Sequence, residues 1–133
     1  MKVGLDTSVV LRLLVGEPAD LARVAVEYLI QIQQKGGCAV VSDLVVAETY
    51  FALQYHYKTP KAEALALLRQ FLTSHGIENS GVAARVMATP HLESAKPGFV
   101  DRIVIQQYLE KTDAVATFER ASRKLPKILV LEP

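Results

Sequence analysis

The sequence predicts an α/β protein: a three-layer α/β/α sandwich with a central, mainly parallel sheet. Short apolar segments typical of strands alternate along the chain with longer segments of helical periodicity, and this alternation is typical of parallel strands joined by helices. The chain has 133 residues, the length of one domain, with no internal repeat and no Gly/Ser linker. We therefore expect a single domain over residues 1–133, built with right-handed crossovers.

The first half of the chain contains two predicted strands and four predicted helices. Turn and cap residues separate them: Gly16 ends the first helix, Gly36 and Gly37 stop the second, and Ser42 or Asp43 can cap the third. Helical segments are recognised by apolar residues three and four positions apart. The strands are expected over residues 2–6 and 38–42, and the helices over 8–16, 19–35, 44–57 and 60–76.

The second half begins with the segment that is hardest to interpret, Ile77 to Lys96. Its run VAARVMA suits a helix or a strand, and Pro90 interrupts either, so we expect a helix broken near Pro90. The remaining elements are a helix over 99–111, a strand over 114–118, a helical turn over 119–124 and a final strand over 127–132.

Composition and charge indicate a cytoplasmic protein with no membrane partner. No apolar run reaches the roughly 18 residues needed to span a bilayer, and the N-terminus lacks a signal-peptide pattern. The net charge is only +1, from 15 basic and 14 acidic side chains. If four acids are reserved for a metal site, the remaining surface carries a net charge of +5, which suits a polyanionic partner.

Three acids stand in apolar surroundings: Asp6, Glu48 and Asp101. Glu48 is the only charged residue from Leu44 to Tyr55, so the sequence predicts a buried carboxylate there. Burying an unpaired carboxylate costs several kcal/mol at least, so either a basic side chain or a metal ion should compensate for it.

Each of these acids also has a purely structural interpretation. Asp6 can be the N-cap of the following helix, and Asp101 can complement the dipole of a helix in its first turn. Glu48 can pair with a basic residue in the core, and Glu119, between Phe118 and Arg120, can be an ordinary solvated side chain. The metal-site hypothesis gains weight because all four acids are expected at one edge of the sheet, where ligands bind to such folds.

A cluster of carboxylates without His or Cys at metal-ligand spacing favours Mg²⁺ or Mn²⁺ over zinc. One or two such ions suit phosphodiester hydrolysis, because an ion can activate a water molecule and a second can stabilise the leaving oxygen.

The stretches that carry these acids resemble the PIN-domain family, and most closely the VapC-type ribonuclease toxins of toxin–antitoxin pairs. They are MKVGLDTSVVLRLL, VVSDLVVAETYFAL, GFVDRIVIQQYLEKTDAVATFERASRKL and KILVLEP. The resemblance implies the same three-layer fold. It also implies that Asp6, Glu48 and Asp101 match the first three metal-site acids, with Asp6 and Asp101 as direct ligands, and that Thr7 supports the site.

At the fourth acidic position this sequence departs from the family pattern. Members usually show Thr-x-Asp, whereas this chain has Thr117 followed by Glu119. Glutamate keeps the charge but is longer by one methylene, which can displace a second ion. Thr117 can still orient a carboxylate or a water molecule. Asp113 ranks below Glu119, because it precedes the strand and is expected at its opposite end.

The resemblance implies a metal-dependent endoribonuclease that leaves 5′-phosphate and 3′-hydroxyl ends, with a small antitoxin as protein partner and a homodimeric assembly. Asp6, Glu48, Asp101 and Glu119 are the predicted catalytic and metal-binding residues. The alternative is a PIN module that binds RNA or a protein partner without cutting. Predicted phosphate contacts are Arg12, Arg102 and Arg120, with Lys58, Lys61, Arg123 and Lys124 as further candidates.

Overall fold

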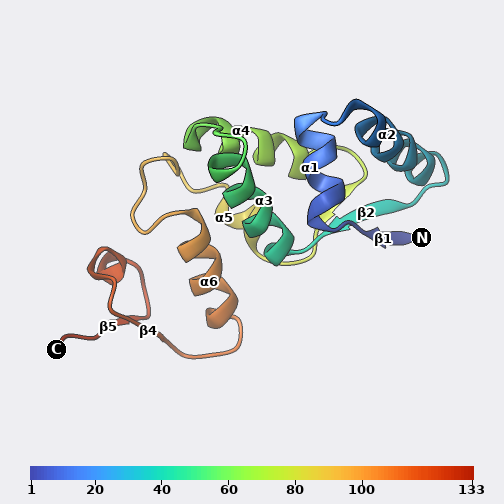
Figure 1. The fold of residues 1–133 in the computed structure, drawn as a ribbon. Helices are drawn as coiled ribbons and strands as arrows, with labels where there is room; N and C mark the ends of the chain where they lie inside the picture. The colour runs from blue at the N-terminus through green and yellow to red at the C-terminus, as the bar shows by residue number, and fades with distance from the viewer. The chain divides into compact units, whose positions relative to one another are not determined.

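The computed structural model describes residues 1–133 and divides into two compact units, Met1–Ala84 and Arg85–Pro133 (Figure 1). The first unit holds three strands and four long helices. Its elements are β1 (Lys2–Gly4), α1 (Thr7–Val15), α2 (Ala19–Gln34), β2 (Cys38–Val41), α3 (Asp43–Tyr55), α4 (Lys61–Leu72) and β3 (Ile77–Asn79). A short helix, α5 (Ala83–Val86), follows β3.

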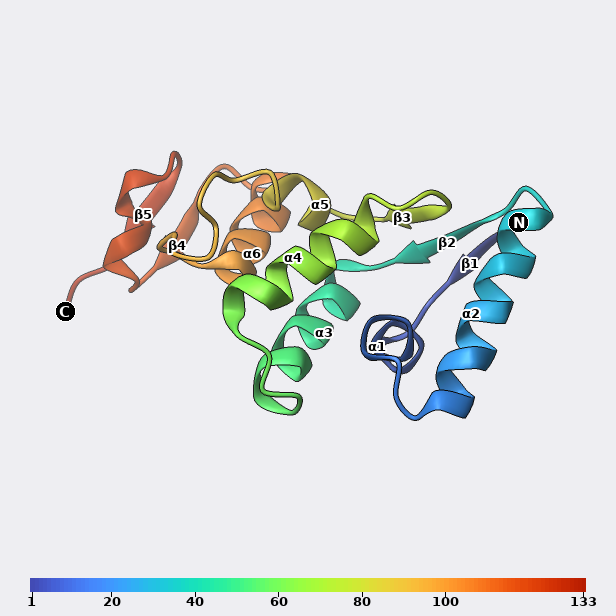
Figure 2. The same cartoon turned by 90° about the horizontal axis from the view of Figure 1, so that it is seen from above.

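The three strands of the first unit form a parallel sheet with β2 in the middle. Val3 of β1 lies opposite Ala39 of β2, which in turn lies opposite Ile77 of β3. Both crossovers advance in the same direction across this sheet, so right-handed connections place α1 to α4 on one of its faces. In Figure 1, α1 and α2 lie above β1 and β2, and Figure 2 shows the same strands from a second direction.

The core of the first unit lies between this sheet and the helices. α1 packs against α2 and α3, and α3 packs against α4. In addition, α2 contacts β2, and α4 contacts β3. Val10, Ala39, Val46, Leu53 and Leu68 are almost completely buried there. Burial of a Val or Leu side chain stabilises the fold by about 1.5–3 kcal/mol, so this core holds the carboxyl ends of β1 and β2 in place.

The second unit contains α6 (Phe99–Leu109), β4 (Val115–Thr117), a 3₁₀ helix η1 (Arg120–Lys124) and β5 (Ile128–Val130). β4 and β5 pair in parallel, with Val115 opposite Ile128. α6 contacts β4, and η1 packs against β5 as the crossover between the two strands. Ile103, Ile105 and Val115 are buried in this unit.

The structure confirms the predicted α/β fold, since helices alternate with strands and every strand pair is parallel. In the Ile77 to Lys96 segment, a helix is present within the run VAARVMA, but only over Ala83–Val86, and Ile77–Asn79 forms strand β3, which was not predicted. The strand arises because β2 offers a free edge for these three residues to pair with, a contact that local sequence does not reveal. No helix combines the length and the apolar character that a bilayer-spanning segment requires.

Candidate metal and nucleic-acid site

Asp6 lies at the carboxyl end of β1 and is the N-cap of α1. Its Oδ1 accepts a hydrogen bond of 2.6 Å from the Ser8 hydroxyl and one of 3.2 Å from the backbone N–H of Val9. These bonds, the Ser8 bond first, hold the pKa of Asp6 below its ordinary value of 3.8. The carboxylate is therefore ionised at neutral pH, and it is exposed to solvent. Asp6 is therefore a helix N-cap, as its structural interpretation predicts. Both bonds use Oδ1, and Oδ2 takes part in neither of them.

Glu48 lies beside Thr7, the residue that follows Asp6. The Thr7 hydroxyl donates a hydrogen bond of 2.9 Å to Oε1 of Glu48. The packing of α1 against α3 brings these two residues together, although they are 41 positions apart in the chain. Glu48, from α3, thus lies next to the residue that follows Asp6, at the N-terminus of α1.

The expectation that Glu48 is buried is wrong, because its side chain is exposed on α3. The charge-free run around it indicated burial on every side of the helix. Instead, the helix is buried through Val46, Thr49, Tyr50 and Leu53, and Glu48 lies between these positions on the open side. The carboxylate therefore needs no buried counter-charge.

The other two acids belong to the second unit. Asp101 is exposed in the first turn of α6, where a negative charge complements the helix dipole. Glu119 is exposed directly after β4 and precedes η1. Thr117, the last residue of β4, uses its Oγ1 to accept a 3.0 Å hydrogen bond from the backbone N–H of Glu119. This bond helps to shape the chain at Glu119, and it uses the Thr117 hydroxyl only as an acceptor.

None of the four acids is neutralised by a basic side chain. The ion pairs in the structure join Lys2 to Glu78, Arg23 to Glu27 and Arg123 to Glu132, all on the surface. Neither unit by itself gathers three acidic, His or Cys side chains into a metal-binding group. The donors present are carboxylate and hydroxyl oxygens, which fit a hard divalent cation such as Mg²⁺ or Mn²⁺.

Of the three predicted phosphate-binding arginines, two are already held by protein groups. Arg12 is half-buried and donates a 3.3 Å hydrogen bond to the hydroxyl of Tyr57. Arg102 is half-buried and donates a 2.7 Å bond from Nε to the carbonyl oxygen of Pro97. Arg120 is exposed in η1. Of the further candidates, Lys58, Lys61 and Lys124 are exposed, and Arg123 pairs with Glu132 at 2.6 Å.

The buried acid of the first unit is Asp43, which sequence reasoning considered only as a cap of its own helix. Ser42 fills that role, and Asp43 instead faces the start of α5. Its carboxylate accepts hydrogen bonds of 2.9 Å from the backbone N–H groups of Val82 and Ala83, and one of 3.1 Å from the Asn79 amide. Asp43 is therefore a structural residue that anchors the turn between β3 and α5.

A signal for this anchor exists in the sequence: the glycine in the segment NSGVAA. A side chain at Gly81 would collide with the carboxylate of Asp43, so the turn can approach Asp43 only without a Cβ atom. Asn79 completes the cluster, because its amide also bonds the carbonyl oxygen of Val41 and accepts from the N–H of Ala84.

The fold and the unpaired carboxylates together define an α/β protein with acidic side chains displayed after its strands. The family model of the PIN domain matches residues 3–128, and the chain belongs to this family. PIN domains are generally nucleases, act on nucleic acid and typically bind divalent metals. No curated protein and no solved structure matches the chain significantly.

Proposed function

We propose that the chain is an endoribonuclease dependent on Mg²⁺ or Mn²⁺, with Asp6, Glu48, Asp101 and Glu119 as its catalytic and metal-binding residues. The observation that carries the proposal is the contact between Thr7 and Glu48, which places a second exposed acid next to the residue that follows Asp6. The PIN match supports the proposal, because it spans residues 3–128 and so includes all four acids.

In the first unit, the exposed carboxylates of Asp6 and Glu48 would hold the ion. The chemistry supplied by a bound ion is the activation of a water molecule for attack on the phosphodiester. Ser8 and Val9 restrain Asp6 through Oδ1, while Thr7 restrains Glu48 through Oε1. Such restraint lowers the entropy that the carboxylates lose when they bind a ligand.

In the second unit, chain direction favours a common location for Asp101 and Glu119. α6 runs into β4 and contacts it, so the N-terminus of α6 and the carboxyl end of β4 are expected at the same end of this unit. Asp101 lies in the first turn of α6, and Glu119 follows the carboxyl end of β4. This topology supports the two residues as the remaining pair of ligands.

The proposal is tested by incubating the purified protein with single-stranded RNA. We expect cleavage with Mg²⁺ or Mn²⁺, none after treatment with EDTA, and recovery when the metal is restored. The products should carry 5′-phosphate and 3′-hydroxyl ends, because water attacks the phosphorus directly. Cleavage that persists in EDTA, or products that end in 2′,3′-cyclic phosphate, would contradict the metal-dependent reaction.

The Thr7 hydroxyl provides a more local test. Thr7→Val keeps the side-chain shape but removes the bond to Glu48, and residues that orient metal ligands typically contribute about 10- to 100-fold to affinity or activity. We expect a loss of that size in the cleavage rate, with the free energy of unfolding changed by no more than about 1 kcal/mol. Thr73→Val is the matched control, because Thr73 bonds only backbone oxygens of α4. Equal rates for the two variants would contradict a supporting role for Thr7.

A PIN module without catalytic activity is the second candidate, and Glu119 is the observation that favours it. Glu119 replaces the aspartate of the Thr-x-Asp pattern, and its side chain forms no capping bond to η1. Binding of RNA without cleavage in either metal would support this alternative. If the wild-type protein cleaves RNA and the Glu119→Asp variant cleaves it faster, the chain is instead an active nuclease with a suboptimal fourth ligand.

The toxin role, the antitoxin partner and the homodimer are also proposals. Exposed apolar side chains on α2 support a protein partner: helical spacing places Leu21, Val24 and Tyr28 on one side of α2, and Val26 and Ile30 on another. The apolar side chains of α4, by contrast, are used in the core. A small protein encoded beside this gene that co-purifies with the chain and stops cleavage would support the toxin role, and a neighbour without effect on cleavage would contradict it.

A further inference from the structure

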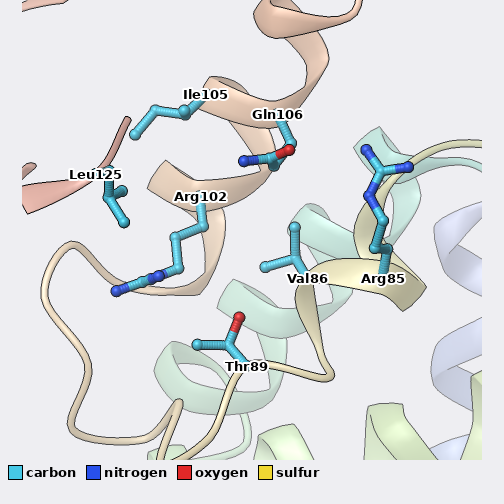
Figure 3. Close-up of a pocket in the computed structure, with 7 residues that line it drawn as sticks. All are labelled: Arg85, Val86, Thr89, Arg102, Ile105, Gln106 and Leu125. Carbon is cyan, nitrogen blue, oxygen red and sulfur yellow. The ribbon is translucent and has the colours of Figure 1, made fainter. Parts of the chain in front are cut away.

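The second unit contains a cavity of about 280 Å³ that none of the proposed metal ligands lines. We call it the arginine trough (Figure 3). Its lining residues come from α5 and the turn after it, from α6, and from the residue after η1: Arg85, Val86, Thr89, Arg102, Ile105, Gln106 and Leu125. No carboxylate lines it, so its two positive charges are not neutralised from within.

The two arginines of the trough are available to an anion in different ways. Arg102 is half-buried, and its Nε bond to Pro97 fixes the guanidinium while leaving the terminal N–H groups for a ligand. Arg85 is exposed, and its guanidinium makes no ion pair or hydrogen bond with the protein. Figure 3 shows the two guanidinium groups on opposite sides of Val86. A ligand that contacts both must therefore carry two separated negative charges.

Between the arginines, the trough offers an apolar floor and two neutral polar groups. Val86 and Ile105 are buried, so their side chains are fixed in place and make the base of the trough apolar. Thr89 and Gln106 add a hydroxyl and an amide, which can donate to and accept from a ribose or the edge of a base. Figure 3 shows the Gln106 amide in the middle of the lining set.

We propose that the arginine trough binds single-stranded RNA, with one phosphate at Arg85, another at Arg102, and the strand between them crossing Val86. This inference rests on the proposed function, since the strand is that of the RNA substrate, and it assigns Arg85 as a substrate-binding residue. Separated charges joined by a ring-bearing linker are the chemistry of an oligonucleotide. A free diphosphate shares only the charge.

Fluorescence anisotropy with a labelled single-stranded RNA of about twelve nucleotides, in EDTA so that nothing is cut, tests the trough. We expect Arg85→Gln and Arg102→Gln each to weaken binding about five- to tenfold. Each should also reduce the slope of log K against log salt by about 0.7, the value for one lost contact to a single strand. Arg23→Gln is the charge-matched control on α2 and should change binding less than twofold. Variants of the trough that bind like this control would overturn the proposal, as would a wild-type protein that binds no RNA.

Further measurements separate the trough from misfolding, from free anions and from catalysis. Arg85→Lys keeps the charge at an exposed position, so it should retain most of the salt slope. Inorganic pyrophosphate, added at the same concentration of phosphate groups as the RNA, should not displace the RNA. If it does displace the RNA, the ligand of the trough is not a nucleic-acid strand. If RNA binding depends on the two arginines but the wild type cleaves no RNA, the proposed RNA site in the trough is supported and the proposed nuclease activity is contradicted. If the wild type cleaves RNA with Mg²⁺ and Arg85→Gln does so with the same KM, the nuclease activity is supported and the RNA site in the trough is contradicted.

Discussion

Asp6→Asn is expected to lower the rate of metal-dependent RNA cleavage at least about a hundredfold while the protein stays folded. Asparagine caps helices about as well as aspartate, so the bond from the N–H of Val9 is retained and the free energy of unfolding should hardly change. The negative charge that would bind the ion is lost. Because a direct ligand is removed, the effect should exceed the roughly 10- to 100-fold typical of residues that only orient ligands.

The matched control for this variant is Asp20→Asn, which removes an exposed acid from the first turn of α2. It should cleave like the wild type. Mn²⁺ binding, followed by electron paramagnetic resonance or calorimetry, should weaken in Asp6→Asn and not in Asp20→Asn. If Asp6→Asn cleaves RNA at the wild-type rate, Asp6 is a helix cap only and the proposed metal site is wrong.

The lowered pKa of Asp6 adds a dependence on pH with a defined sign. A depressed pKa in the folded state contributes stability at pH values above the ordinary value of 3.8, and this contribution is lost as the pH falls through the folded value. Protonation of Asp6 therefore requires a pH below its ordinary pKa of 3.8. A loss of cleavage in mildly acidic buffer should be attributed to another group.

Asp43→Ala has the largest expected effect on stability, a loss of about 3 kcal/mol in the free energy of unfolding. The substitution leaves the N–H groups of Val82 and Ala83 and the amide of Asn79 without this acceptor, and an unsatisfied buried donor costs about 1–3 kcal/mol. For a chain of this length the loss corresponds to a fall of roughly 10 °C in Tm. Asp20→Ala, which removes an exposed acid, should stay within about 0.5 kcal/mol of the wild type.

A double-mutant cycle with Gly81 identifies the cause. Gly81→Ala should destabilise the wild type, because its new methyl group meets the Asp43 carboxylate. In the Asp43→Ala background that obstacle is absent, so the same change should cost much less. Urea unfolding of the four proteins provides the measurement. Additive effects, or an Asp43→Ala variant as stable as Asp20→Ala, would contradict the role of Asp43 as the anchor of α5.

The fold was predictable to the extent that its elements depend on local sequence. Gly16 and the pair Gly36 and Gly37 lie where α1 and α2 end, and Ser42 caps α3 as one of the two expected residues. Strand β3 was missed because Ile77–Asn79 has too few residues for a periodic signal. Its conformation depends on pairing with β2, which lies more than 30 residues earlier in the chain.

The candidate site divides in the same way. The cap formed by Asp6 involves residues two and three positions away, so a sequence pattern could indicate it. The exposure of Glu48 and its bond to Thr7 depend on which side of α3 packs against α1, and an apolar run does not specify that side. Asp43 was underestimated because its partners near Asn79 are almost 40 residues away.

By itself, the sequence determined the α/β class, the alternation of strands and helices and the membership of the PIN family. The class and the alternation follow from spacing, caps and breakers that act within a few residues. The family membership follows from the match of the PIN model to residues 3–128. Only the tertiary structure decided that Glu48 is exposed beside Thr7, that Asp43 is the buried acid, and that Arg85 shares a cavity with Arg102. The physical reason is that burial and side-chain contacts depend on which distant segments pack together, and that packing is a property of the folded chain as a whole.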